Sequence, residues 1–326
     1  MTGWGEAALL RDPIYLEEWI NSGWIFICEY LLPEVIGKEI SSYEYYQKIK
    51  NLRRNNIAKY AVETALWSLE AQENKIPYWK LVGGVNKKIE IGASVGINSS
   101  IKKTLDIVEA EIARGLKRIK LKIKPGWDYE IVRAVRKKYS DILLMVDANS
   151  SYKLSDLPKL KALDEFNLLM IEQPLAHDDI IDHAKLAAEL ITPICLDESI
   201  CSSEDARKAI EIKACKIINV KPARVGSLYE VQKINEMAKM NGVKLWCGGM
   251  LESDLGKVSN LAAASLSEFS LPADISDWST HFSSTFTNVD KYYDEGNYFL
   301  DDKFGLNIEI DEKWLDSHTV REAIVK

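Results

Sequence analysis

Histidine and cysteine are scarce in this chain of 326 residues, and chemistry that depends on them is not expected. There are four histidines and five cysteines, with no CxxC pair, and no histidine lies in an HExxH motif or beside a GxSxG turn. These absences argue, in turn, against a cysteine zinc site, zinc-dependent hydrolysis and a serine nucleophile. An odd number of cysteines also argues against a disulfide framework. The sequence therefore predicts a protein of a reducing compartment, the cytoplasm.

Long apolar runs and an excess of positive charge are absent as well. No apolar stretch reaches the ~18 residues that a membrane span needs, and the first residues, MTGWGE, lack the regions of a secretory signal. With 42 basic and 49 acidic residues the formal net charge is −7, which does not suit broad contact with nucleic acid. We therefore expect a small-molecule partner, with no nucleic acid and no membrane. The length suits two domains or one large one.

What the chain does contain is a repeat of short apolar runs. The runs begin at Ile91, Arg118, Leu143, Leu168, Pro193, Lys216 and Lys244, at steps of 23 to 28 residues. Each has the composition of a strand that is covered on both faces. Helical patterns lie between them, over residues 101–115, 155–166, 178–190 and 203–212. Parallel strands with right-handed helical crossovers are the expected result.

The closed form of this repeat is an eight-stranded α/β barrel of the TIM type. A weaker eighth strand is expected over residues 271–275. The alternative is an open doubly wound sheet. The sequence favours it less, because no phosphate-binding GxGxxG follows the first run.

The two ends of the chain have a different pattern. Residues 1–88 show helical spacing of apolar side chains, over 13–31 and 43–73. Towards the other end, we expect a hairpin over 298–310 and a short helix over 312–317. We expect residues 1–88 and 281–326 to form a capping domain, and residues 89–280 to form the barrel.

Ionisable residues stand at the ends of five successive predicted strands. They are Lys122, Asp147, Glu172, Asp197 and Lys221, at spacings of 25, 25, 25 and 24 residues. Because the strands of a barrel end at one rim, all five should meet at its mouth. The two lysines are four strands apart, which is half a turn of eight. They should therefore face each other, with the three carboxylates in an arc between them.

Three carboxylates at one site need a cation to balance their charge. Oxygen ligands favour a hard ion, so Mg²⁺ is expected, with Mn²⁺ as a substitute. A substrate carboxylate beside this ion would place its α-carbon between the lysines, where loss of the α-proton would be stabilised. Lys120 and Arg224 are placed to lower the pKa of the lysine base, although ordinary ion pairs would explain them equally well. For five residues in register, salt bridges alone are the less favoured explanation.

Several segments resemble the enolase superfamily, in its muconate-lactonizing subgroup. They are KLK at 120–122, DAN at 147–149, EQP at 172–174, LDES at 196–199 and NVKP at 219–222. KLKIKPGWD at 120–128 and WCGGMLES at 246–253 are similar to o-succinylbenzoate synthases and N-succinylamino acid racemases. The resemblance implies a (β/α)7β-type TIM barrel with an α+β capping domain. It also implies that two N-terminal strands of that domain are missing here.

The same resemblance implies roles for individual residues. Lys122 and Lys221 would be the acid–base pair, in a superfamily that uses a Lys or His base with Mg²⁺. The metal ligands would be Asp147, Glu172 and Asp197. Substrate contacts are implied for Ser94, Lys120, Asn149, Gly249 and Met250, with Glu198 and Arg224 supporting the site.

The function implied first is that of an o-succinylbenzoate synthase, a lyase that dehydrates 2-succinyl-6-hydroxy-2,4-cyclohexadiene-1-carboxylate in menaquinone biosynthesis. Racemisation of N-succinylamino acids, an isomerase reaction, is the alternative on the same residues. Dipeptide epimerase and muconate cycloisomerase activities come after it. A truncated, non-catalytic relative is the alternative of another class. In every enzymatic case the substrate is a small carboxylate, and we also expect a homo-oligomer.

Overall fold

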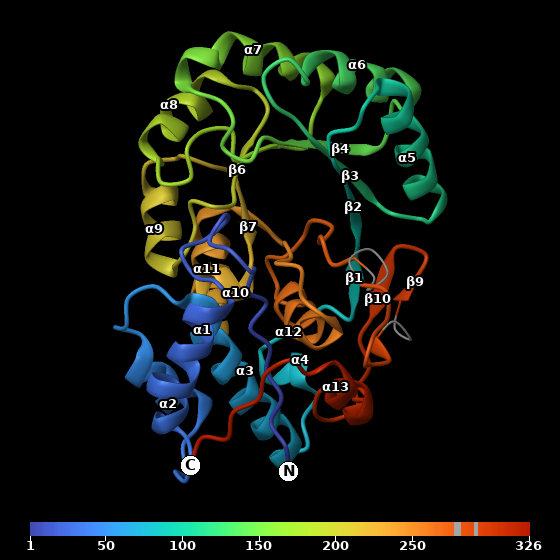
Figure 1. Ribbon diagram of the computed structural model, residues 1–326. Helices are drawn as coiled ribbons and strands as arrows, with labels where there is room; N and C mark the ends of the chain where they lie inside the picture. The colour runs from blue at the N-terminus through green and yellow to red at the C-terminus, as the bar shows by residue number, and fades with distance from the viewer. Residues whose placement is uncertain (277–281, 290–292) are drawn as a thin grey trace.

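A curled sheet of seven parallel strands forms the centre of the computed structural model, which describes residues 1–276, 282–289 and 293–326 (Figure 1). The strands pair in their order along the chain. They are β2 (Gly92–Val95), β3 (Arg118–Lys122), β4 (Leu143–Asp147), β5 (Ile171–Glu172), β6 (Ile194–Leu196), β7 (Ile217–Val220) and β8 (Lys244–Cys247). Each begins within three residues of a predicted apolar run, so the repeat is confirmed.

The segment 268–274 joins the two edges of this sheet. On one side, Leu245 of β8 donates a backbone hydrogen bond to the segment, and on the other Gly92 of β2 donates one to the carbonyl of Ala273. The sheet is therefore closed into a barrel, and the open doubly wound alternative is wrong. The predicted eighth strand is reduced to isolated bridges. Pro272 lies within it and has no N–H to donate.

Helices connect successive strands and cover the outside of the barrel (Figure 1). They are α5 (Ile101–Ala113), α6 (Tyr129–Lys138), α7 (Leu157–Lys161), α8 (Ile181–Glu189), α9 (Ser203–Glu211), α10 (Pro222–Val225), α11 (Leu228–Asn241) and α12 (Asp254–Ala264). The single helix expected over 155–166 is wrong. Short 3-10 segments, Leu154–Asp156 and Ala162–Phe166, flank α7. Pro158 is tolerated only in a first turn, so a new helix has to start there.

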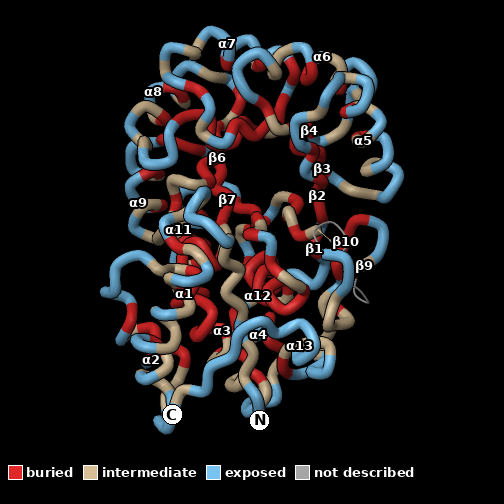
Figure 2. The backbone as a smooth tube through the Cα atoms, viewed as in Figure 1, coloured by how far each residue is buried: buried red, intermediate tan, exposed pale blue. Residues whose placement is uncertain are grey.

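Alternate side chains of β3 share the face that lines the barrel. Arg118 and Lys120 are buried, and their cations lie 4.8 and 5.1 Å from the ring centroid of Trp246. Beside them, an apolar cluster fills the interior of the barrel. It consists of Met145, Met170, Cys195, Ile217 and Trp246. Figure 2 shows the buried strands surrounded by the more exposed outer helices. The interior is thus closed below the mouth, and Lys122 is the next residue on the same face.

The N-terminal part of the chain is helical only from Ile20 onward. Its elements are α1 (Ile20–Phe26), a π-helical turn (Ile27–Leu31), a 3-10 turn (Leu32–Glu34), α2 (Ser42–Ile49), α3 (Asn56–Glu73) and α4 (Tyr78–Leu81). The helix expected over 13–31 is therefore wrong in its first part, because residues 1–19 are non-helical and make distant contacts instead. The helix expected over 43–73 is interrupted, since Arg54 and Asn55 have positive φ angles.

The C-terminal part contains a hairpin and a helix. The hairpin consists of β9 (Tyr293–Asp294) and β10 (Asn297–Phe299), and β10 also pairs with β1 (Lys88–Glu90). It lies earlier than the predicted 298–310, because its turn is at Glu295 and Gly296, which both have positive φ. The predicted final helix is confirmed as α13 (Glu312–His318). The boundary predicted between residues 280 and 281 lies outside the described residues. No helix of the described ranges could span a membrane.

Glutamate side chains satisfy the N-termini of three helices. Glu6 accepts hydrogen bonds from Ser253 and from the Gly256 N–H at α12, and Glu18 accepts from the first N–H groups of α3. Glu63 of α3 accepts from the N–H of Leu228, the first residue of α11, at 2.8 Å. Each bond places a carboxyl oxygen at the positive end of a helix. Two of these contacts, those of Glu6 and Glu63, fasten the N-terminal segments to the barrel helices.

Glu63 should make the protein less stable as the pH rises. Its side chain is completely buried, and burial raises its pKa to about 8. Between about pH 4.5 and 8 the folded chain thus retains a proton that the unfolded chain releases. Stability should then fall with pH, by at most about 1.4 kcal/mol per unit. Glu63→Gln should flatten the dependence of Tm on pH from 5.5 to 7.5, whereas Glu73→Gln, on the exposed face of α3, should not. Equal slopes in all three proteins would contradict this.

Candidate active site

The sheet brings the five predicted ionisable residues to one end of the barrel. Lys122 of β3 pairs with Asp147 of β4, which pairs in turn with Glu172 of β5. Asp197 and Lys221 are the first residues after β6 and β7. All five therefore stand at the C-terminal ends of the strands, as their spacing predicts. In the order of the sheet, β3 and β7 are four positions apart, as expected for opposed lysines.

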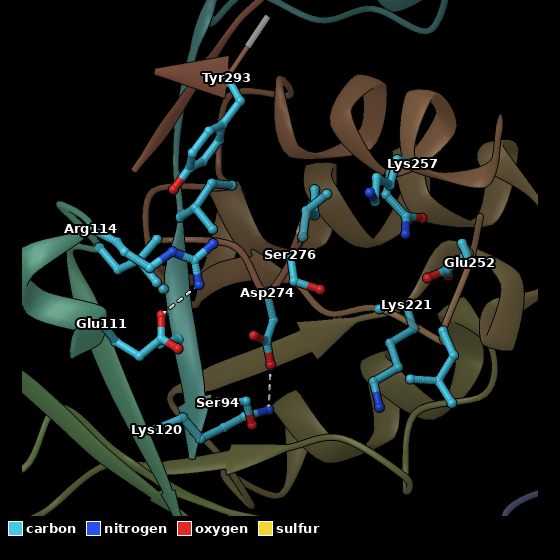
Figure 3. A pocket seen from close by; sticks show the side chains of 18 of the residues that line it. Ser94, Glu111, Arg114, Lys120, Lys221, Glu252, Lys257, Asp274, Ser276 and Tyr293 are labelled. Carbon is cyan, nitrogen blue, oxygen red and sulfur yellow. Dashed lines mark hydrogen bonds and ion pairs between the residues drawn. The ribbon is translucent and has the colours of Figure 1, made fainter. Parts of the chain in front are cut away.

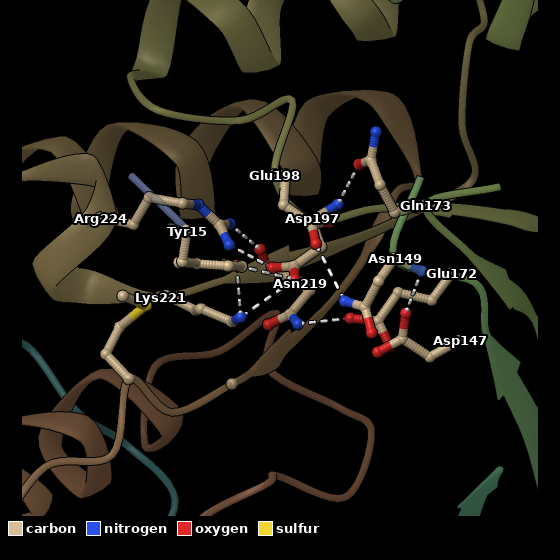
Figure 4. Close-up of polar contacts among 12 residues, drawn as sticks. Tyr15, Asp147, Asn149, Glu172, Gln173, Asp197, Glu198, Asn219, Lys221 and Arg224 are labelled. Atoms are coloured by element: carbon tan, nitrogen blue, oxygen red, sulfur yellow. Dashed lines mark hydrogen bonds and ion pairs between the residues drawn. The ribbon is translucent and has the colours of Figure 1, made fainter. Parts of the chain in front are cut away.

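Asp197 lies between two cations, Lys221 and the buried Arg224 (Figure 4). Lys221 Nζ donates to its Oδ2 at 2.9 Å, and Arg224 Nη1 donates to its Oδ1. Arg224 is oriented by a further bond, from Nη2 to the carbonyl of Asn219 at 2.6 Å. Although burial acts to raise it, Arg224 and Lys221 hold the pKa of Asp197 well below its usual range. Asp197 is consequently an ionised carboxylate at neutral pH.

Lys120 and Lys122 contact the other carboxylates of the site. Lys120 Nζ lies 2.7 Å from Asp274 Oδ2, 3.5 Å from Glu172 Oε2 and 3.6 Å from Asp147 Oδ2. Lys122 Nζ lies 2.6 Å from Asp147 Oδ2. Burial opposes the charge of Lys120, but the three carboxylates around it outweigh burial and raise its pKa. Lys120 therefore remains a cation at the centre of the acidic residues.

The two carboxylate oxygens of Glu172 differ in their hydrogen bonding. Its Oε1 accepts a hydrogen bond from Asn219 Nδ2 at 2.7 Å, whereas the buried Oε2 has no hydrogen-bond partner. Burial and the charge of Asp147 raise the pKa of Glu172 to about 8. A buried carboxylate of this kind is stabilised by gaining a proton or a cation.

Whether this site suits a metal ion can be judged from the groups that could coordinate one. Among residues 1–276, 282–289 and 293–326, no group of three or more His, Cys, Asp or Glu is already arranged as a metal centre. The carboxylates form ion pairs with lysine ammonium groups instead. The donor chemistry nevertheless fits a hard divalent cation, since all three carboxylates are buried and Glu172 Oε2 accepts no hydrogen bond. Asp147, Glu172 and Asp197 are the residues that would hold it.

The expected effect of Arg224 on a lysine base is present but outweighed in the structure as described. Burial and the charge of Arg224 both act to lower the pKa of Lys221, but the nearby Asp197 carboxylate outweighs them and the pKa is raised well above its usual value. Arg224 and Lys120 are both ion-paired with carboxylates, as the alternative explanation held.

Left-handed backbone conformations occur at two residues that closely follow strand ends. They are Asn149 and Gln173, with φ of +39° and +37°. Gln173 is fully buried, and its Oε1 accepts from the N–H of Asp197 at 2.9 Å. Asn149 accepts from Lys122 Nζ at 2.5 Å and donates to Glu198 Oε1 at 2.9 Å. Strained backbone of this kind concentrates at functional sites, and here it connects the ends of β4, β5 and β6.

The mouth of the barrel opens into a cavity of about 300 Å³ (Figure 3). Of the predicted site residues, those that line it are Ser94, Lys120, Lys122, Lys221 and Gly249. Met250 is buried instead in an apolar cluster that includes residues of α3 and α12. Asn149 and Glu198 contact each other beside Asp147 and Asp197 rather than in the cavity lining.

Sequence reasoning missed three residues of the site. Asn219 shares a strand face with Lys221, two residues later, and that spacing could have identified it. Asp274 stands in the predicted eighth strand and pairs with Lys120 (Figure 3). Tyr15, whose hydroxyl contacts Lys221 at 2.8 Å, comes from the extended N-terminal segment and has no local signal.

Comparison with known proteins gives one consistent result. The family model for the enolase C-terminal domain-like family matches residues 104–314. The chain is 41% identical over 320 residues to an o-succinylbenzoate synthase of Geobacillus kaustophilus, covering 98% of this chain and 85% of that protein. It is 44% identical over 283 residues to an N-succinylamino acid racemase of Thermus thermophilus, covering 86% and 77%.

The solved structures agree. An enolase superfamily member from Listeria innocua superposes with a TM-score of 0.92 at 36% identity, covering 97% of this chain and 85% of that one. Barrel, site residues and relatives thus lead to one assignment: the chain belongs to the enolase superfamily, among relatives that include o-succinylbenzoate synthases and N-succinylamino acid racemases.

Proposed function

We propose that this protein removes the proton α to a carboxylate in a Mg²⁺-dependent reaction, and that it acts as an o-succinylbenzoate synthase. The observation that carries the proposal is the cavity into which Lys122 and Lys221 both open, with Asp147, Glu172 and Asp197 on the strands between them. One lysine on each side of an α-carbon provides a base and a cation for the charge that develops.

The charges around the cavity support a carboxylate substrate. Four lysine side chains, those of Lys120, Lys122, Lys221 and Lys257, line it. In the structure described here they are ion-paired, in that order, with Asp274, Asp147, Asp197 and Asp254. A divalent cation on the carboxylates would supply positive charge to the substrate carboxylate and release lysines for the substrate.

In the dehydration, Lys122 acts first as the base. Its amine takes the α-proton, and the resulting ammonium returns a proton to the departing hydroxide, so that water leaves. Lys221 stays protonated on the opposite face and stabilises the enediolate. Asn149 holds Lys122 through its accepted hydrogen bond of 2.5 Å.

Racemisation of N-succinylamino acids is the second candidate, favoured by the 44% identity to a racemase. It requires each lysine to exchange a proton on its own face.

The test is to assay the purified chain with Mg²⁺ on both substrates. Formation of o-succinylbenzoate from 2-succinyl-6-hydroxy-2,4-cyclohexadiene-1-carboxylate would be followed by absorbance, and inversion of an N-succinylamino acid by chiral chromatography. We expect dehydration with kcat/KM of roughly 10⁴ M⁻¹ s⁻¹ or more, lost in Lys122→Ala. Conversion of the amino acid alone would favour the racemase, and conversion of neither would refute the proposal.

A further inference from the structure

Tyr15 reaches the active site from a distant part of the chain. It belongs to the non-helical segment formed by residues 1–19, yet its hydroxyl accepts a hydrogen bond from Lys221 Nζ at 2.8 Å. The same hydroxyl donates to Asp197 Oδ2 at 3.2 Å (Figure 4). Lys221, Tyr15 and Asp197 therefore form a closed triangle, because Lys221 also donates to Asp197 at 2.9 Å.

The ring of Tyr15 contacts Lys221 as well. Lys221 Nζ lies 4.9 Å from the ring centroid, within the range of a cation–π interaction. The ammonium group has three N–H donors, of which Tyr15 and Asp197 accept two. Among residues 1–276, 282–289 and 293–326 no further acceptor bonds to it. Hydrogen bonds to Tyr15 and Asp197 thus fix the ammonium group at the end of the otherwise flexible side chain of Lys221.

The segment that carries Tyr15 is anchored on both sides of it. The N–H of Ile20 donates to the carbonyl of Leu10 at 2.9 Å, which closes the loop between them. Glu18 is 7% exposed and accepts hydrogen bonds from the N–H groups of Ile57, at 2.9 Å, and the next residue of α3. Tyr15 and its neighbour Leu16 also pack against the apolar cluster that includes residues of α3 and α12. Tyr15 is therefore a fixed contact of the site.

We propose that Tyr15 is a positioning residue for Lys221: its hydroxyl keeps the Lys221 ammonium directed at the substrate face on which this lysine works. Asp197 cannot do this alone, because it is also a proposed metal ligand and is shared with Arg224. The inference rests on the proposed function. A reacting group misplaced by about 1 Å loses roughly 100-fold in rate, so loss of one hydroxyl can be measured.

The experiment follows exchange of the α-proton in D₂O for each enantiomer of an N-succinylamino acid. Tyr15→Phe removes the hydroxyl and keeps the ring, and Tyr30→Phe makes the same change on an exposed tyrosine of the N-terminal region. Lys221→Ala identifies the enantiomer whose proton faces Lys221. We expect Tyr15→Phe to slow exchange from that enantiomer about 10- to 100-fold. Exchange from the other enantiomer should change less than about threefold, and Tyr30→Phe should change neither.

A second measurement uses dehydration, so that an enzyme without racemase activity is also informative. Tyr15→Phe should lower kcat at least about tenfold with KM within about twofold, and should have no further effect in a Lys221→Ala background. Equal slowing of both enantiomers, or an equal effect with and without Lys221, would overturn the role of Tyr15. Wild-type protein that neither exchanges nor dehydrates would refute the proposed function itself.

Discussion

Removal of divalent cations with EDTA should abolish turnover by the wild-type protein, and added Mg²⁺ or Mn²⁺ should restore it. The reason is the group of buried carboxylates, of which Glu172 is the most informative because its Oε2 lacks a hydrogen-bond partner. Asp197 is less suitable for mutation, since it also holds Lys221 and Arg224. Glu172→Gln should lower activity at least about 100-fold.

Calorimetric titration with Mg²⁺ separates metal binding from catalysis. Glu172→Gln should weaken Mg²⁺ binding strongly, because an amide replaces a charged ligand. The matched control is Glu252→Gln, which changes a buried glutamate that lines the cavity but is not one of the proposed ligands. It should bind Mg²⁺ as the wild type does. Full activity of the wild type in excess EDTA would refute the metal-dependent mechanism.

Lysine ion pairs balance the charge of the carboxylates in the structure described here. Lys122 and Lys221 contact Asp147 and Asp197, so that like charges are not left facing one another. The same contacts compete with a metal for these carboxylates. In the proposed mechanism, a divalent cation held by these carboxylates would release the lysines and leave their ammonium groups available to an anionic substrate.

The barrel and its five ionisable residues could be predicted because both follow from a local period. A run of strand residues every 25 residues or so indicates parallel strands and favours a barrel, and a residue at the end of each run should then reach the mouth. Lys122 and Lys221 are placed by this argument alone. The repeat cannot predict contacts with segments that lie outside it.

Residues 1–19 illustrate this limit. Their apolar spacing suggested a helix from Pro13, yet Glu6 and Glu18 are used to satisfy the N-termini of α12 and α3. Tyr15 meets Lys221 across 206 positions of sequence. No property of the segment itself predicts these partners. The hairpin was misplaced for a different reason, since backbone turn preference at Glu295 and Gly296 outweighed the strand-like composition that follows.

Exchange of the α-proton in D₂O should depend on opposite lysines for the two enantiomers of an N-succinylamino acid. Lys122 and Lys221 open into one cavity from strands four positions apart, so each can reach only one face of the α-carbon. Lys122→Ala should stop exchange from one enantiomer, and Lys221→Ala from the other, each by at least about 100-fold more than from the opposite enantiomer. Equal losses in both variants would contradict the opposed arrangement.

Lys221→Arg should separate racemisation from dehydration in one preparation. Arginine keeps the positive charge but cannot act as a base, because its pKa exceeds about 12. Racemisation should vanish, since no base remains on that face. Dehydration needs only the charge there, so it should be retained in part, and Lys221→Ala should be roughly 100- to 1000-fold slower than the wild type. If racemisation survives in Lys221→Arg while dehydration is lost, Lys122 is not the dehydration base and the two lysines have the reverse roles.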